Sequence, residues 1–160
     1  MRSAGNMCAS VNYCDENLRE FVAYVIGTCH AERTDHLTVA GRRAIQTVLD
    51  LCHRGYLHVM YRTAAPAPHV AENLADYLWI LNVPSETELR TLIAKLGPDL
   101  RMGGTLVVGF EVSISSRHAS RLRQVLLDQG FVPVQQQIDP AGRTLLICGR
   151  QEPCAQAQAA

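Results

Sequence analysis

The stretch from Asp76 to Phe110 constrains the fold most, because two short apolar runs flank a single amphipathic segment within it. Inside that segment, Ser85 and Glu88 have the spacing of a capping box at a helix start. The dipeptide Gly97-Pro98 ends the same helix, since proline cannot continue it. The pattern predicts a β-α-β unit, whose two strands are parallel and buried on both faces.

The rest of the chain carries a second unit of this kind and a terminal hairpin. We expect parallel strands at 36–41, 56–61, 76–81 and 105–110, and an antiparallel hairpin at 131–138 and 144–149. A first helix begins at Asp15 or Asn17. A second helix opens at Arg42, and its apolar residues predict a buried face made of Ala44, Ile45, Val48, Leu49 and Cys52. The fold class is therefore α/β, a three-layer sandwich with a mostly parallel Rossmann-like sheet and a C-terminal antiparallel hairpin.

Length and charge limit the kind of protein this is. The 160 residues predict a flexible N-terminus at 1–14, one α/β domain at 15–150 and a disordered tail at 151–160. Fifteen basic residues balance fifteen acidic ones, so no net charge steers the chain to nucleic acid or to an acidic membrane surface. No apolar run approaches the roughly 20 residues that span a bilayer, and no secretory signal is recognisable. We expect a cytoplasmic protein.

The six cysteines contain no Cys-x-x-Cys pair and are expected to be reduced thiols. Cys29-His30 and Cys52-His53 do not suggest a metal site, because adjacent helical residues point about 100° apart. Cys29 and Cys52 continue the apolar faces of their helices and are expected in the core.

Residues 74–150 resemble the C-terminal half of class I S-adenosylmethionine-dependent methyltransferases. The matching features are the strand Asp76-Tyr-Leu-Trp-Ile-Leu, the turn and strand Leu100-Arg-Met-Gly-Gly-Thr-Leu-Val-Val, and Leu127-Asp-Gln-Gly-Phe131 before the hairpin. The resemblance implies a Rossmann-like sheet, S-adenosylmethionine as cofactor, and methyl transfer as the activity.

Three features that the resemblance implies for the cofactor site are missing. The glycine-rich turn after the first strand reads Val39-Ala40-Gly41-Arg42-Arg43-Ala44, with one glycine followed by two arginines. Tyr61 and Arg62 stand where an acidic residue would bind the ribose. The connection after Arg62 is too short for the family's third strand. These departures favour a domain that has lost S-adenosylmethionine binding, has no cofactor, and serves as a scaffold or interaction module.

Two other functions remain open. One is an atypical S-adenosylmethionine-dependent methyltransferase with an unknown substrate. The other is a small Rossmann-like protein that binds an anionic ligand, because ligands of open α/β sheets lie beyond the carboxyl ends of the strands. The candidate ligand-binding residues there are Gly41, Arg42, Arg43, Asn82 and Glu111, and no catalytic residue is identified. His118, with Arg117, Arg121 and Arg123, is expected on a solvated helix face.

The strand at 56–61 suggests self-association. Without the family's third strand it becomes an edge strand with unpaired backbone groups, and its apolar residues point to both faces. A two-fold homodimer is the commonest way to cover such an edge. The loop at 63–73 is the alternative cover.

Overall fold

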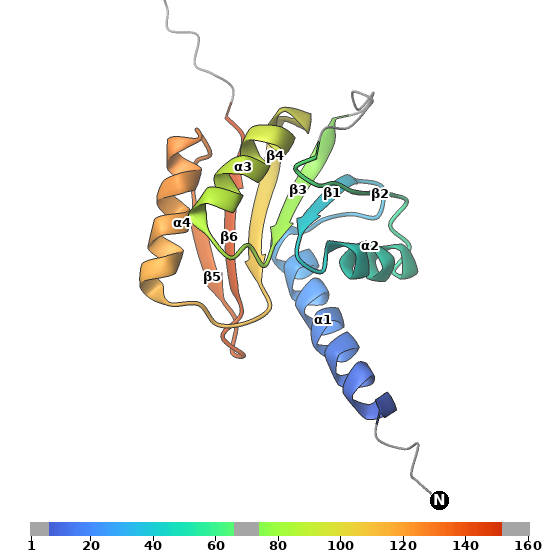
Figure 1. The fold of residues 1–160 in the computed structure, drawn as a ribbon. Helices are drawn as coiled ribbons and strands as arrows, with labels where there is room; N and C mark the ends of the chain where they lie inside the picture. Colours follow the sequence, from blue (N-terminus) through green and yellow to red (C-terminus); the bar gives the residue numbers. More distant parts are fainter. Residues whose placement is uncertain (1–6, 66–73, 152–160) are drawn as a thin grey trace, which may run out of the picture.

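The computed structural model describes residues 7–65 and 74–151, which form one six-stranded sheet with helices on both faces (Figure 1). The elements are α1 (Met7–Cys29), β1 (His36–Gly41), α2 (Ala44–His53), β2 (His58–Tyr61), β3 (Ala75–Leu81), α3 (Glu86–Leu96), the 3₁₀ turn η1 (Gly97–Asp99), β4 (Leu100–Phe110), α4 (Ser116–Asp128), β5 (Gln135–Ile138) and β6 (Thr144–Gly149). The strand order is β2-β1-β3-β4-β6-β5. Strands β1 to β4 pair in parallel and β6 pairs antiparallel with both β4 and β5, so the predicted fold class is confirmed.

Alternate side chains along the central strands build the two apolar layers of the sandwich. In β3, Leu78 and Ile80 pack with α3 and α4, while Trp79 and Leu81 pack with α1 and α2. All four side chains are at most 1% exposed. This alternation follows from the two-residue period of a strand, and it makes both faces of the central sheet apolar.

The helix signals read from the sequence hold for α3. The Ser85 hydroxyl accepts a hydrogen bond from the Glu88 N–H at 3.2 Å, which is one half of the predicted capping box. The predicted apolar face is buried and consists of Leu89, Leu92, Ile93 and Leu96. Ser115 caps α4 in the same manner through the His118 N–H.

Several element boundaries differ from the predictions. Helix α1 begins at Met7, before the expected cap positions, so it overlaps the proposed flexible segment 1–14; residues 1–6 lie outside the described residues. Strand β4 begins at Leu100 rather than at 105, because Gly103 continues the sheet by donating to the Arg150 carbonyl at 2.9 Å. Strands β2 and β5 are shorter than expected. Before β2, the buried Tyr56 side chain donates its hydroxyl to the Ala31 carbonyl at 2.8 Å. Before β5, Phe131 forms only an isolated antiparallel bridge with Arg150.

The buried face of α2 is not the one that the sequence predicted. Ala44 is buried and Val48 packs against the core as expected, but the other buried residues are Thr47 and Leu51. Ile45 is 54% and Leu49 56% exposed. The helix therefore lies on the sheet by a neighbouring face, and a stripe of apolar side chains remains on its outer surface.

The cysteines also differ from the prediction. Cys148 is buried and burial raises its pKa to about 12. Cys29 is partly buried and burial raises its pKa to about 11. Cys52 is exposed, because it continues the outer face of α2, so its predicted place in the core is wrong. These three cysteines are free thiols.

The turn between β5 and β6 is organised by Asp139, whose carboxylate is 5% exposed. It accepts the Arg143 backbone N–H at 2.8 Å and the Arg143 Nε–H at 2.5 Å. Burial by itself raises the pKa of Asp139, but these hydrogen bonds and the guanidinium charge outweigh it and hold the pKa below its usual value. The turn chemistry that the sequence indicated is thus fixed by one carboxylate.

Candidate functional site

Backbone hydrogen bonds gather the predicted site residues at the carboxyl edge of the sheet. The Arg42 N–H donates to the Leu81 carbonyl at 3.0 Å, which ties the end of β1 to the end of β3. The Asn82 N–H donates to the Gly109 carbonyl at 2.8 Å, which ties β3 to β4. The segments that follow these three parallel strands therefore lie side by side. This edge, beyond the carboxyl ends of the strands, is where open α/β sheets bind their ligands.

Gly41 makes the turn out of β1 possible. Its φ is 98°, a backbone conformation that other residues rarely adopt. A Cβ at this position would lie 2.1 Å from the Leu81 carbonyl oxygen, so no side chain fits there. Only glycine fits at this position, because β3 approaches the turn so closely.

Arg43 and Glu111 form an ion pair across the ends of β1 and β4. Arg43 Nη1 lies 2.9 Å from Glu111 Oε2, and the Glu111 side chain is only 9% exposed. Arg43 holds this position with a left-handed backbone, φ 61° and ψ 19°, which costs a residue with a side chain about 1–2 kcal/mol. Asn82 is also left-handed, with φ 52°, and its Oδ1 accepts the Glu111 N–H at 3.0 Å. Two left-handed residues with side chains therefore flank one buried carboxylate.

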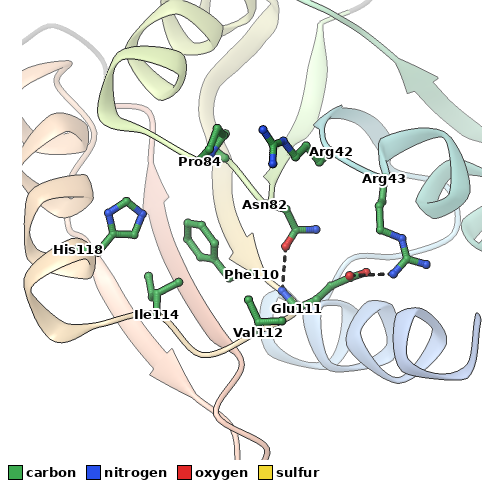
Figure 2. A pocket seen from close by; sticks show the side chains of 10 residues that line it. Arg42, Arg43, Asn82, Pro84, Phe110, Glu111, Val112, Ile114 and His118 are labelled. Carbon is green, nitrogen blue, oxygen red and sulfur yellow. Dashed lines mark hydrogen bonds and ion pairs between the residues drawn. The ribbon is translucent and has the colours of Figure 1, made fainter. Parts of the chain in front are cut away.

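A cavity of about 440 Å³ opens at this edge, and Figure 2 shows the side chains around it. Four predicted site residues line it, namely Arg42, Arg43, Asn82 and Glu111. Gly41 instead borders a smaller cavity of about 230 Å³, beside Tyr61 and Arg62. Arg42 borders both. The structure thus brings the five candidates to one edge but divides them between two cavities.

The apolar wall of the larger cavity was not predicted from the sequence. It consists of Val83, Pro84, Phe110, Val112 and Ile114. His118 also lines the cavity, and its ring meets that of Phe110 edge to face, with centroids 6.0 Å apart. The predicted solvated face is confirmed for its exposed arginines, which are Arg117, Arg121 and Arg123. His118 departs from it, because its side chain is half-buried and lines the cavity. Ser115 offered a possible signal, because a cap there sets His118 in the first turn of α4, beside the strand ends.

The described part of the chain shows neither a cluster of metal-binding side chains nor a helix that could cross a membrane. Residues 7–65 and 74–151 contain no group of three or more His, Cys, Asp or Glu side chains arranged to hold a metal ion. Among the helices described, none combines the length and the hydropathy needed to cross a bilayer.

Comparison with known proteins supports the fold and no more. No protein-family model matches the sequence, and no curated protein matches it either. Solved structures do match. An O-methyltransferase family protein from Burkholderia thailandensis has a TM-score of 0.58 at 14% identity, over 93% of this chain and 61% of that one. Human N-acetylserotonin methyltransferase, solved in complex with S-adenosylmethionine, has a TM-score of 0.59 at 9% identity, over 94% of this chain and 61% of that one.

A third neighbour matches over its whole length. CalS10, an amino pentose methyltransferase from Micromonospora echinaspora with bound S-adenosylmethionine, has a TM-score of 0.56 at 10% identity, over 94% of this chain and 100% of that one. The chain spans about 61% of the length of the first two neighbours. The fold is that of the class I S-adenosylmethionine-dependent methyltransferases, as the sequence resemblance implied.

Proposed function

We propose that this methyltransferase-like domain has lost S-adenosylmethionine binding in the family's manner and acts as an interaction module that pairs with a second copy of itself. The loss of S-adenosylmethionine binding is supported mainly by the ion pair between Arg43 and Glu111. The pairing with a second copy is supported by the exposed apolar residues of α2 and β2.

The turn after β1 does not fit the cofactor. A glycine-rich turn lets the backbone approach a ligand closely and present its N–H groups. Here Arg43 adopts the left-handed conformation that glycine prefers, yet it carries the largest polar side chain. Its guanidinium crosses to Glu111 and fills the space beside the turn (Figure 2). A ligand would have to displace this side chain and leave a buried carboxylate without its partner, which is costly.

The end of β2 does not fit the ribose. The described residues that directly follow this strand, 62–65, include no carboxylate. The Arg62 guanidinium pairs instead with Asp99 at 3.1 Å. Both side chains are largely buried, at 17% and 22% exposed, so this ion pair is a fixed part of the molecule. The cavity beside Arg62 measures about 230 Å³. That is below the roughly 300 Å³ at which pockets for small-molecule ligands begin.

Calorimetric titration of the purified protein with S-adenosylmethionine and S-adenosylhomocysteine tests the loss of cofactor binding. We expect no saturable heat up to millimolar ligand. Saturable binding at low micromolar concentration would overturn the proposal and favour an atypical methyltransferase. The double variant Arg43→Gly with Glu111→Gln removes the ion pair without leaving a buried charge. A gain of binding in that variant alone would identify the ion pair as the block.

The interaction role is supported by what lies exposed at one edge of the sheet. Within the described residues β2 pairs only with β1, so its outer backbone groups have no strand beside them. We define the α2–β2 surface by its exposed residues, which are Ile45, Leu49, Cys52, Leu57, Met60 and Tyr61. The predicted alternative cover is the loop at 63–73, of which residues 66–73 lie outside the described residues. Strand β2 carries no Lys, Arg or Pro, the residues that usually protect an edge from pairing.

A second copy is the partner that this surface fits best. An exposed strand pairs with an identical strand when a two-fold axis sets the two antiparallel, because the donors of each then meet the acceptors of the other. The neighbouring α2 stripe adds apolar area on the same side (Figure 1). The result would be one continuous sheet through two domains.

Sedimentation velocity at micromolar protein tests this pairing. We expect a dimer for the unchanged protein and a monomer for Met60→Lys, which places a charge on the edge strand. The matched control is Ile138→Lys on β5, the opposite edge, where the replaced side chain is 62% exposed. A monomer from the unchanged protein, or equal dissociation by both variants, would refute pairing through β2.

A further inference from the structure

The larger cavity, at the carboxyl ends of β3 and β4, has features that self-association does not use. Its volume of about 440 Å³ falls within the range of pockets for small-molecule ligands. It is bounded on one side by apolar side chains and on the other by charged ones. Such a combination selects a ligand that is apolar at one end and charged at the other.

The contacts at the cavity show which of its charged side chains has no partner of opposite charge. Arg43 and Glu111 neutralise each other at 2.9 Å, and the second carboxylate oxygen of Glu111 is buried away from solvent. The Asn82 carboxamide oxygen is used by the Glu111 N–H. Arg42 differs from all three, because its guanidinium has no hydrogen bond or ion pair with the described residues. The cavity therefore presents one uncompensated positive charge.

Arg42 is placed to use that charge. Figure 2 shows Arg43 directed toward Glu111, whereas Arg42 extends over the cavity toward Pro84. The Arg42 backbone is fixed by its N–H bond to the Leu81 carbonyl, so the side chain starts from a rigid point. A guanidinium binds a planar carboxylate through two parallel hydrogen bonds, which gives both affinity and orientation.

The opposite wall suits a ring. Phe110 is 4% exposed, and the His118 ring meets it edge to face at 69° between planes. Ile114 and Val112 complete the wall. Aromatic rings favour offset or edge-to-face contacts, so this pair can receive a third ring. Inorganic phosphate would leave the apolar wall in water, and an amine would face the charge of Arg42.

We propose that this cavity is a binding site for a small apolar carboxylate, with the carboxylate on Arg42 and an aromatic or branched apolar body against Phe110 and His118. The site needs neither S-adenosylmethionine nor a second copy of the chain. Of the two arginines predicted to bind an anionic ligand, this proposal assigns the role to Arg42, because Arg43 is already paired with Glu111.

Ligand-observed NMR and calorimetry with benzoate and phenylacetate test the proposal on the full chain. We expect binding in the micromolar to millimolar range for these acids and none for inorganic phosphate, benzamide or benzylamine. Arg42→Gln should weaken benzoate binding by about tenfold or more, as expected for a hydrogen-bonded charge. The matched control is Arg117→Gln, which removes the same charge from an exposed residue that does not line the cavity.

Three results of these titrations would overturn the proposed carboxylate site. Absence of benzoate binding at millimolar concentration overturns the proposal, as does benzylamine binding more tightly than benzoate. Equal weakening by the Arg42 and Arg117 variants would reduce the effect to general charge and would also overturn it. Val112→Asp adds a negative charge at an exposed lining position, 65% exposed, and should abolish binding without affecting the fold. Because the titration contains no S-adenosylmethionine and is repeated on the Met60→Lys variant, its result is independent of the proposed function.

Discussion

Replacing Arg43 by glycine has two opposing effects on the free energy of unfolding. Glycine relieves the left-handed strain at φ 61°, a gain of about 1–2 kcal/mol. The same change leaves the Glu111 carboxylate, only 9% exposed, without its counter-charge. Breaking a buried ion pair in this way costs about 3–5 kcal/mol. The second effect is the larger, so Arg43→Gly should lower the free energy of unfolding by about 1–4 kcal/mol.

The partner substitution completes the cycle. Glu111→Gln removes the buried charge, and Arg43, whose side chain is 30% exposed, keeps contact with water, so we expect a loss of only about 1 kcal/mol. The double variant combines strain relief with no buried charge. Its stability should lie within about 1 kcal/mol of the unchanged protein, and so above that of Arg43→Gly alone. This is strong non-additivity, as expected of residues in contact.

Urea unfolding followed by tryptophan fluorescence measures all four proteins. Trp79 is the single tryptophan and is fully buried in β3, so its emission reports the loss of the core. The reasoning is refuted if the two single losses simply add in the double variant. It is refuted equally if Arg43→Gly is more stable than the unchanged protein, because strain would then outweigh the ion pair.

Other predictions concern the turn, the thiols and the hairpin. Gly41→Ala should cost at least about 3 kcal/mol of stability, measured by thermal unfolding, because its methyl group would lie 2.1 Å from a carbonyl oxygen; an unchanged Tm would contradict this. Iodoacetamide at pH 8 should label Cys52 before Cys148, read by peptide mass mapping, since only the former is exposed; equal labelling of the native protein would count against the fold of α2. The Asp139 carboxylate, whose pKa is lowered in the fold, contributes stability above its unfolded pKa of about 3.9 that is lost as pH falls through the folded pKa. Asp139→Asn should therefore destabilise the protein at pH 7 and flatten its stability change below about pH 4, and unchanged acid sensitivity would reject the role given to Arg143.

The sequence predicted those features that depend on local chemistry. The cap at Ser85 and the buried stripe of α3 followed from side-chain spacing alone, because a helix presents residues three and four apart on one face. Gly41 was recognisable in the sequence as the residue that ends β1. The close approach of the Leu81 carbonyl, which excludes a side chain at this position, was not predictable. Local signals therefore fixed the order and type of the elements.

Features that depend on which elements lie beside each other were not predictable in this way. In α2 two apolar stripes overlap, and the choice between Leu49 and Leu51 as the buried residue depends on how the helix lies on the sheet. The apolar wall of the larger cavity is another case. Phe110 and His118 belong to different elements and meet only because the segment after β4 turns back to start α4. Both errors concern contacts between elements, on which a spacing pattern carries no information.

The division of the core into two layers has a consequence for the order in which the protein assembles. Apart from Ala40, every described residue buried in the layer beneath α3 and α4 lies between Leu78 and Cys148. The layer beneath α1 and α2 needs residues from both halves of the chain. We therefore expect the segment from β3 to β6 to close its apolar layer first, and the N-terminal half to dock onto that sheet afterwards. Amide hydrogens of β4 and β6 should exchange most slowly with solvent, and those of β2 most rapidly, so that the edge strand opens many times for each complete unfolding.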